Sequence, residues 1–273
     1  MNSDNTATAI APEATIAATN AVTQWRGRDT LGVYWREVRF QFIGMLRSPG
    51  FALPTLLFPS MFYLFFGVLF SHGAQQATYR LATYSTFGVI GPALFGFGVG
   101  IAVEREKGIL ALKRVFPLPV GAYFCARIGM AMLFALLIVL ILSLLGITLG
   151  GVSLAFGAWL GMTALLVAGA LPFCALGLVI GLSVGGQAAP AIINLVYLPM
   201  SFLSGLWVPL QYMPHFLQQF AVSLPAYHFC QLVLAVIGQG NDGSNAVHVA
   251  YLAVFTAVCL LIAARAWRRI QDR

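Results

Sequence analysis

The chain has 273 residues, of which 60% are hydrophobic and only 8% are charged, and its mean hydropathy is +0.87. An ordinary soluble domain carries about 25% charged residues, so this composition excludes a soluble globular protein and indicates one that lies in a lipid bilayer. The net charge of +7 would favour nucleic acid as a partner in a soluble domain, but in a membrane protein its meaning depends on where the basic residues lie.

Two segments precede the membrane-embedded part. Residues 1–24 contain no basic residue and no long apolar core, so they predict a disordered cytoplasmic tail and not a cleaved signal peptide. Residues 25–49 predict an amphipathic helix in the membrane interface that ends near Pro49. Arg36 and Arg39 lie on its polar face, and a soluble helix with no special role is the alternative. Its apolar face is formed by Leu31, Trp35, Val38, Phe42 and Met45.

Six transmembrane helices are expected in the domain that spans residues 50–264. Each is an apolar stretch of about the 20 residues that cross a hydrocarbon core. The predicted spans are 51–71, 81–103, 128–149, 154–182, 189–208 and 247–264. Between the last two spans, prolines and polar residues divide the chain into two short apolar pieces. They predict a pair of short helices that lie at the outer interface or dip into it.

The basic residues predict the orientation of the chain. All of them except Arg80 fall before the first span, between the second and third spans, or in the basic tail 265–273. In a six-span topology these three segments share one side, so the positive-inside rule places both termini in the cytoplasm. The net charge is therefore an orientation signal, and nucleic acid is not an expected partner.

The interior of the spans argues against ion-coupled transport, because no Asp, Glu, Lys or Arg lies deep within them. Polar and aromatic side chains could line a path for a large amphipathic or lipid-like solute, with ordinary packing as the alternative. The candidates are Tyr63, Phe66, Asn194, Tyr197 and Ser201. Glycines spaced four residues apart at 157/161 and at 177/181/185 favour close approach between helices.

The charged loop 104–127 has two interpretations. It is suited to dock onto a cytoplasmic partner, because it combines charges with a short apolar series. The alternative interpretation is an ordinary cytoplasmic loop whose basic residues only orient the chain. The chain contains no phosphate-binding G-x-x-x-x-G-K-[ST] motif, and its scattered cysteines show no metal-ligand spacing, so no catalytic residue and no metal site are predicted.

Three motifs together resemble the ABC-2 type permeases, the membrane subunits of ABC exporters that move drugs, lipids or polysaccharides. The first is the interfacial helix that ends in Arg47-Ser48-Pro49. The second is the E-R-E-K-G-x-L run from Glu104, followed by P-L-P at 117–119. The third, and most specific, is N-L-V-Y-L-P-M-S-F-L-S-G-L-W-V-P-L from Asn194, with M-P at 213–214 and L-P-A-Y-H at 224–228.

The resemblance implies an all-α permease that pairs with a second copy and with a separate ABC ATPase, which would bind ATP and Mg²⁺ while this chain holds no cofactor. It implies ATPase-coupling roles for Glu104, Arg105, Glu106, Lys107, Ile109, Leu112 and Arg114. The interfacial helix would also contact the ATPase, through Trp35, Arg36, Arg39, Phe42 and Arg47. An outer gate would contain Trp207, Pro209, Tyr212 and Tyr227.

The expected function is therefore that of a multi-pass permease in the inner or plasma membrane. It would couple ATP hydrolysis by the partner subunit to export of a lipid-like, drug-like or polysaccharide substrate, without enzymatic activity of its own. Membrane lipid is a further expected partner. The alternative is an ATP-independent membrane scaffold or assembly protein, whose basic faces would hold anionic lipid or protein partners.

Overall fold

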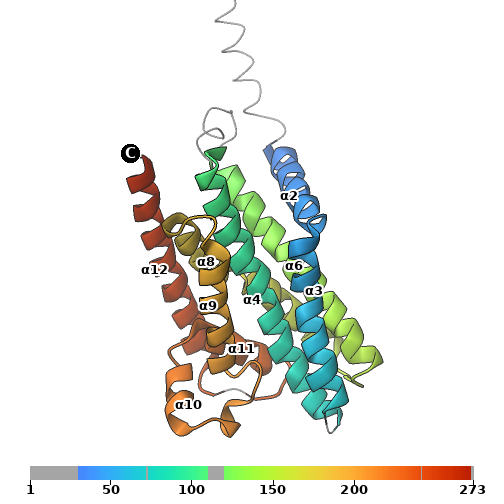
Figure 1. Cartoon of the computed structure of the whole chain (residues 1–273). Coiled ribbons are helices and arrows are strands. Elements are labelled where there is room, and N and C mark those ends of the chain that lie inside the picture. The colour runs from blue at the N-terminus through green and yellow to red at the C-terminus, as the bar shows by residue number, and fades with distance from the viewer. Residues whose placement is uncertain (1–29, 72, 110–119, 241, 272–273) are drawn as a thin grey trace, which may run out of the picture.

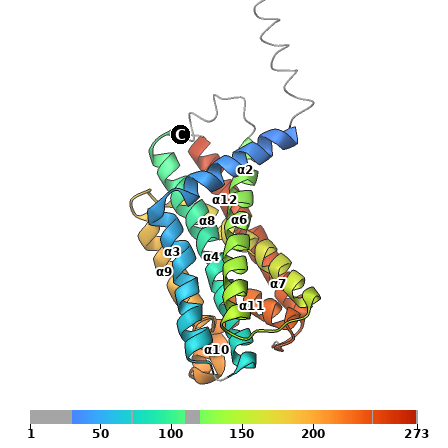
Figure 2. The same ribbon diagram turned by 90° about the vertical axis from the view of Figure 1, so that its right-hand side faces the viewer.

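The computed structural model describes residues 30–71, 73–109, 120–240 and 242–271, and within them the regular elements are all helices (Figure 1). The predicted tail 1–24 lies outside the described residues. The first helix, α2 (Thr30–Leu46), lies across one end of the bundle and turns sharply into α3 (Pro49–Phe62) (Figure 2). The remaining long helices run roughly along one direction, as expected for a membrane-spanning bundle.

Among the described residues, five helices are long and apolar enough to cross a membrane, or six if the bent pair His215–Ala221 and Pro225–Val236 is counted as one span. Four of them follow the predicted first, second, third and sixth spans, and in the fourth α7 (Phe156–Ala168) and α8 (Leu171–Ser183) run on from one another. The five are Pro49–Leu69, Ala74–Glu106 (α4), Tyr123–Thr148 (within α6, Val120–Thr148), Phe156–Ser183 and Asn245–Ile270 (within α12, Asn245–Gln271). The predicted all-α membrane architecture is therefore correct.

The predicted fifth span is a shorter helix than expected. α9 (Ala189–Leu203) has 15 residues, because the chain leaves the helix at Gly205, whose φ of +79° is favourable only for glycine. The chain just before α9 and the chain just after it nevertheless contact α4 at two points that are 22 residues apart. The N–H of Gly186 donates to Glu106 at the end of α4, and the Tyr84 hydroxyl donates to the Trp207 carbonyl.

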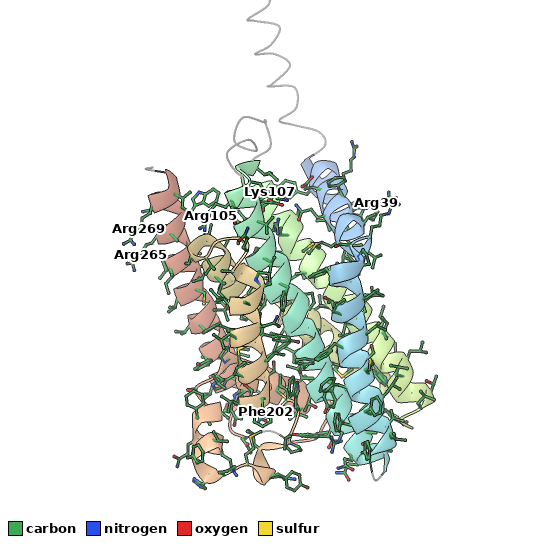
Figure 3. All side chains as sticks on the ribbon, in the orientation of Figure 1. Arg39, Arg105, Lys107, Phe202, Arg265 and Arg269 are labelled. Carbon is green, nitrogen blue, oxygen red and sulfur yellow. The ribbon has the colours of Figure 1, made fainter. Side chains whose placement is uncertain are left out.

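Charge divides the bundle into two ends. Arg39, Arg105, Lys107, Arg265 and Arg269 lie together at the end that carries α2 and the C-terminus, hereafter the basic end (Figure 3). Phe202, near the end of α9, lies toward the opposite or far end (Figure 3).

The centre of the bundle is α4, which packs against α8, α6, α9, α11 and α3. Contact with α8 is close because glycines face the α4 backbone. A Cβ atom at Gly181 would lie 2.7 Å from the Gly98 carbonyl oxygen, and one at Gly177 would lie 2.9 Å from the Leu94 carbonyl oxygen. By contrast, a Cβ atom at Gly157 would meet nothing within 4 Å. Of the glycine spacings noted in the sequence, the one on α8 brings two helices together.

The first span changes its helical type near the far end. After Pro59 the helix continues as a seven-residue π-helix, η1 (Tyr63–Leu69). The Tyr63 ring packs where a Cβ atom at Gly67 would lie 2.3 Å from it, so only glycine fits at that position. Local π-helices are frequent at functional sites.

The short helices α10 (His215–Ala221) and α11 (Pro225–Val236) meet at an angle of 85°. Two short helices were predicted here, at the outer interface or dipping into it. In α11 the residues from Pro225 to Leu234 are all buried, and this helix packs against α4, α12 and α7. The Tyr227 side chain, a predicted outer-gate residue, is only 5% exposed because it lies inside this packing.

Two buried histidines connect α11 to the start of α12. Their Nδ1 atoms lie 2.8 Å apart, and His228 stacks on Tyr251 with ring centroids 3.9 Å apart. The Nε2 atom of His228 lies 2.8 Å from the Val222 carbonyl oxygen, and that of His248 lies 2.8 Å from the Asp242 carbonyl oxygen. The pair therefore holds α11, α12 and the chain on either side of them in one arrangement.

We expect His248→Ala to loosen α11 from α12, because it leaves a buried ring nitrogen of His228 without this partner. Leaving a buried polar group unpaired costs about 1–3 kcal/mol. Amide hydrogens of α11 should then exchange roughly tenfold faster, measured by hydrogen–deuterium exchange with mass spectrometry. The exposed His215, at the start of α10, provides the control substitution His215→Ala. Equal α11 exchange in both variants would show that the histidine pair does not hold the helix.

Candidate functional site

At the basic end, acidic and basic side chains tie α4 to α6. Glu104 forms an ion pair with Arg127 through its Oε1 atom and accepts a 2.7 Å hydrogen bond from the Tyr123 hydroxyl through Oε2. Arg127 also donates to the Gly96 carbonyl, and a Cβ atom at Gly100 would clash with its guanidinium. The Arg127 side chain is 7% exposed and that of Glu104 is 22% exposed.

The next two residues of α4 hold the connection between α8 and α9. Arg105 donates from Nη1 to the Leu182 carbonyl and from Nη2 to the Val184 carbonyl, the latter at 2.8 Å. The Gly186 N–H donates to the Glu106 carboxylate at 2.6 Å. Consequently the end of α4, α6 and the α8–α9 connection are held as one unit. We call Glu104, Arg105, Glu106, Tyr123 and Arg127 the charged bracket.

Three of the predicted coupling residues belong to the charged bracket. Glu104, Arg105 and Glu106 bind other parts of their own chain. Lys107, by contrast, is exposed just beyond the end of α4, and Ile109 is partly buried. Leu112 and Arg114 lie outside the described residues.

Two members of the bracket, Tyr123 and Arg127, were missed as site residues. In the sequence, Arg127 was one of the basic residues that predict the orientation of the chain. The signal that could have identified it is its place at the start of an apolar stretch, facing the acidic end of the preceding span across a helical hairpin.

A cavity of about 630 Å³ opens beside the charged bracket, between α2, α4, α6 and the start of α9. Glu104 and Arg127 line it, together with Glu37 of α2 and Pro190 of α9. A second cavity, of about 350 Å³, lies further along the bundle between α3, α4 and α9. Gly50, Phe51 and Phe95 line both cavities. The two cavities therefore adjoin, and we call them together the membrane groove.

Toward the far end the groove is bordered by aromatic side chains. Phe87 stacks on Tyr197 with ring centroids 5.0 Å apart and planes inclined by 4°, and the Tyr197 hydroxyl donates to the Phe87 carbonyl at 2.8 Å. Trp207 lies edge-on to Phe87 at 5.4 Å and also contacts Phe62 at 5.3 Å. These contacts join α3, α4, α9 and the chain after α9 in one aromatic cluster.

The predicted path residues are divided by the fold. Asn194 and Tyr197 line the membrane groove. Tyr63 is fully buried, its hydroxyl 3.5 Å from the Ala77 carbonyl, and Ser201 is also fully buried. Phe66 is 43% exposed and packs against Phe62 and Tyr84. The groove therefore brings together only two of the five.

The predicted outer-gate residues lie in three different places at the far end. Trp207 belongs to the aromatic cluster. Pro209 and Tyr212 line a polar cavity of about 850 Å³ that is rich in glutamine side chains. Tyr227 is buried in α11, its hydroxyl 3.5 Å from the Asp242 carboxylate.

The predicted interfacial helix is attached to α6 by one face. Phe42 packs on Phe134 with ring centroids 5.0 Å apart, and Val38 lies where a Cβ atom at Gly129 would meet it at 2.8 Å. The remaining predicted contact residues, Trp35, Arg36, Arg39 and Arg47, are exposed. They therefore form a surface that the rest of the described chain does not cover.

Two comparisons with known proteins found similar sequences. The model of the ABC-2 type transporter family matches residues 33–237. A relative from Bacillus subtilis (strain 168), "Putative transport permease YvfS", is 33% identical over 218 residues, which cover 77% of this chain and 89% of the relative. The region matched by the family runs from α2 to the end of α11, and so contains the charged bracket and the membrane groove.

Proposed function

The chain belongs to the ABC-2 type transporter family and is a transport permease subunit of the cell membrane, and we propose that it exports its substrate with energy from a separate ATPase. The basic end faces the cytoplasm, because basic residues are retained on that side of a membrane. The substrate enters beside the charged bracket and leaves past the aromatic cluster at the far end.

The observation that carries this proposal is the membrane groove. It runs from the Glu104–Arg127 ion pair, through a section lined by Phe51, Phe95 and other apolar groups, to Asn194 and Tyr197. A path that is charged at its entrance and apolar along its length fits an amphipathic, lipid-like solute. The groove therefore favours a lipid-like molecule over a polysaccharide.

A second copy of the chain would cover the groove. The two helices that border it, α3 and α9, both expose large apolar side chains, and a second copy packed on them would close the open side of the groove. On α3 and α9 these are Leu53, Leu57, Met61, Leu195 and Phe202. Two copies facing each other through these helices would enclose one path between them, in the twofold arrangement that is commonest among homo-oligomers.

Energy would reach the path through the charged bracket. The ATPase binds ATP and Mg²⁺ and contacts Lys107, the segment that follows it, and the exposed side chains of α2. Movement of the end of α4 then carries α6 and the α8–α9 connection with it, because the bracket ties them together. The two arrangements of this unit would open the groove to one side of the membrane at a time.

Disulfide cross-linking tests the pairing of two copies. All variants carry Cys125→Ser, because Cys125 is the exposed natural cysteine. Leu195→Cys on α9 should then give a cross-linked dimer in membranes after mild oxidation, whereas Leu261→Cys, on an exposed face of α12, should not. Equal cross-linking at both positions, or none at Leu195→Cys, would contradict this arrangement.

Reversal of a single exposed charge tests the coupling to an ATPase. We expect Lys107→Glu to lower vanadate-sensitive ATP hydrolysis about tenfold in the complex purified through the permease. The substitution places a negative charge where the ATPase would meet the positive charge of Lys107. Arg269→Glu is the matched control, since Arg269 is also basic and exposed at the same end. A wild-type complex that hydrolyses no ATP would favour the scaffold alternative.

A further inference from the structure

A separate apolar cavity lies between α4, α6, α8 and α12 and shares no lining residue with the membrane groove. Its volume is about 590 Å³. Phe97 and Cys174, which are 2% and 3% exposed, line it together with Leu178 and Leu260. The cavity is thus a built depression in the wall of the bundle, formed by side chains from four helices.

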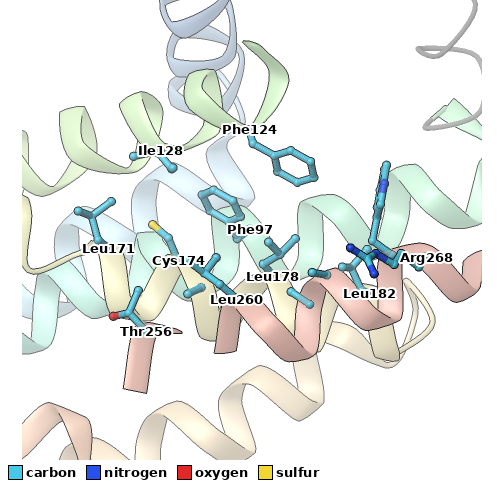
Figure 4. Close-up of a pocket in the computed structure, with 14 residues that line it drawn as sticks. Phe97, Phe124, Ile128, Leu171, Cys174, Leu178, Leu182, Thr256, Leu260 and Arg268 are labelled. Carbon is cyan, nitrogen blue, oxygen red and sulfur yellow. The ribbon is translucent and has the colours of Figure 1, made fainter. Parts of the chain in front are cut away.

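The walls of this cavity offer almost nothing to a polar ligand. The Thr256 hydroxyl already donates to the Leu252 carbonyl of its own helix at 2.6 Å. One charged side chain, Arg268, lines the cavity. Figure 4 shows Arg268 at one end of the cavity, with Leu171 and Thr256 at the other. The occupant must therefore be apolar along its length and negatively charged at one end.

The position of the charge relative to the membrane identifies the occupant further. Arg268 lies on α12 between Arg265 and Arg269, which Figure 3 places at the basic end. The charged end of the cavity is therefore level with lipid headgroups, and its apolar part lies at the depth of the acyl chains. Basic pockets between membrane helices are suited to anionic lipid headgroups.

We propose that this cavity binds one anionic glycerophospholipid from the leaflet at the basic end. An acyl chain fills the space between α6 and α12, and the phosphate accepts hydrogen bonds from the Arg268 guanidinium. Phe124 of α6 meets Trp267 of α12 edge-on, with ring centroids 5.7 Å apart, beside the headgroup position. The lipid therefore completes the contact between α6 and α12 below this aromatic pair.

Native mass spectrometry of the full-length permease tests this site. The protein is purified in detergent and titrated with phosphatidylglycerol or, separately, with phosphatidylcholine. We expect wild type to retain one phosphatidylglycerol per chain and to bind phosphatidylcholine at least fivefold more weakly. Arg268→Gln should weaken phosphatidylglycerol binding about fivefold, the effect of one basic residue at a membrane surface.

Matched variants separate this site from the surrounding lipid. Leu260→Trp places a large ring in the cavity and should abolish retention of the lipid, whereas Leu261→Trp, on the neighbouring exposed position of α12, should not. Arg269→Gln is the corresponding control for Arg268→Gln. Equal retention in all four variants, or equal binding of both lipids by wild type, would overturn the proposal. The assay needs neither ATPase nor transport, so its outcome is independent of the proposed export function.

Discussion

Replacement of Arg127 by methionine is expected to destabilise the permease by about 3 kcal/mol, because it leaves the Glu104 carboxylate without its ionic partner in a partly buried place. The substitution also removes the donor to the Gly96 carbonyl. For a chain of this size such a loss lowers the unfolding midpoint on the order of 10 °C. The midpoint is measured on purified protein in detergent by intrinsic fluorescence during heating.

Two further variants show whether the ion pair causes this effect. Arg39→Met removes an exposed basic side chain from α2 at the same end of the bundle and should leave the midpoint nearly unchanged. The double variant Glu104→Gln/Arg127→Met removes both charges and should recover part of the loss, since no unpaired carboxylate remains. If Arg127→Met melts like Arg39→Met, the charged bracket does not hold α4 to α6.

Gly181→Val is expected to have a similarly large effect, about 3 kcal/mol, through packing. A Cβ atom at this position would lie 2.7 Å from the Gly98 carbonyl oxygen, which belongs to the backbone of α4 and cannot turn aside. The two helices must separate, and the contacts between them weaken along their length. We expect less folded protein in membranes and a lower unfolding midpoint, measured by fluorescence-detected size-exclusion chromatography after heating.

The chain contains a matched control for this substitution. Gly157 also lies in an apolar helix with a glycine four residues later, but a Cβ atom there would meet nothing within 4 Å. Gly157→Val should therefore keep wild-type behaviour. Similar destabilisation in both variants would indicate that valine disturbs these helices regardless of what they pack against.

How much of the site could be predicted differed between its parts. The motif run from Glu104 correctly marked a charged segment at the end of α4, but its first three residues bind the chain itself. Which partner a charged side chain finds depends on helices that are far apart in sequence, as with Arg105 and the Val184 carbonyl. Periodicity within one helix contains no information on those contacts.

The path residues illustrate the same limit. Tyr63, Asn194 and Tyr197 are polar groups in apolar spans, and hydropathy treats them alike. Their surroundings differ because each side chain points in a different direction. Successive residues on a helix are rotated by about 100°, and the neighbouring helices determine which faces are covered. Tyr63 packs beside Gly67 and Gly146, whereas Asn194 and Tyr197 face the groove.

The amino-acid sequence was enough to predict a membrane protein that is built of about six apolar helices and resembles the ABC-2 type permeases. Hydropathy is a local quantity, and a bilayer requires about 20 apolar residues for each crossing. Each span can therefore be recognised from one continuous stretch of sequence. The folded structure was needed to show that Glu104, Arg105 and Glu106 bind α6 and the α8–α9 connection, that α11 is buried, and that a groove lies between α2, α3, α4, α6 and α9. Each of these depends on contacts between distant segments, which form only when the helices pack.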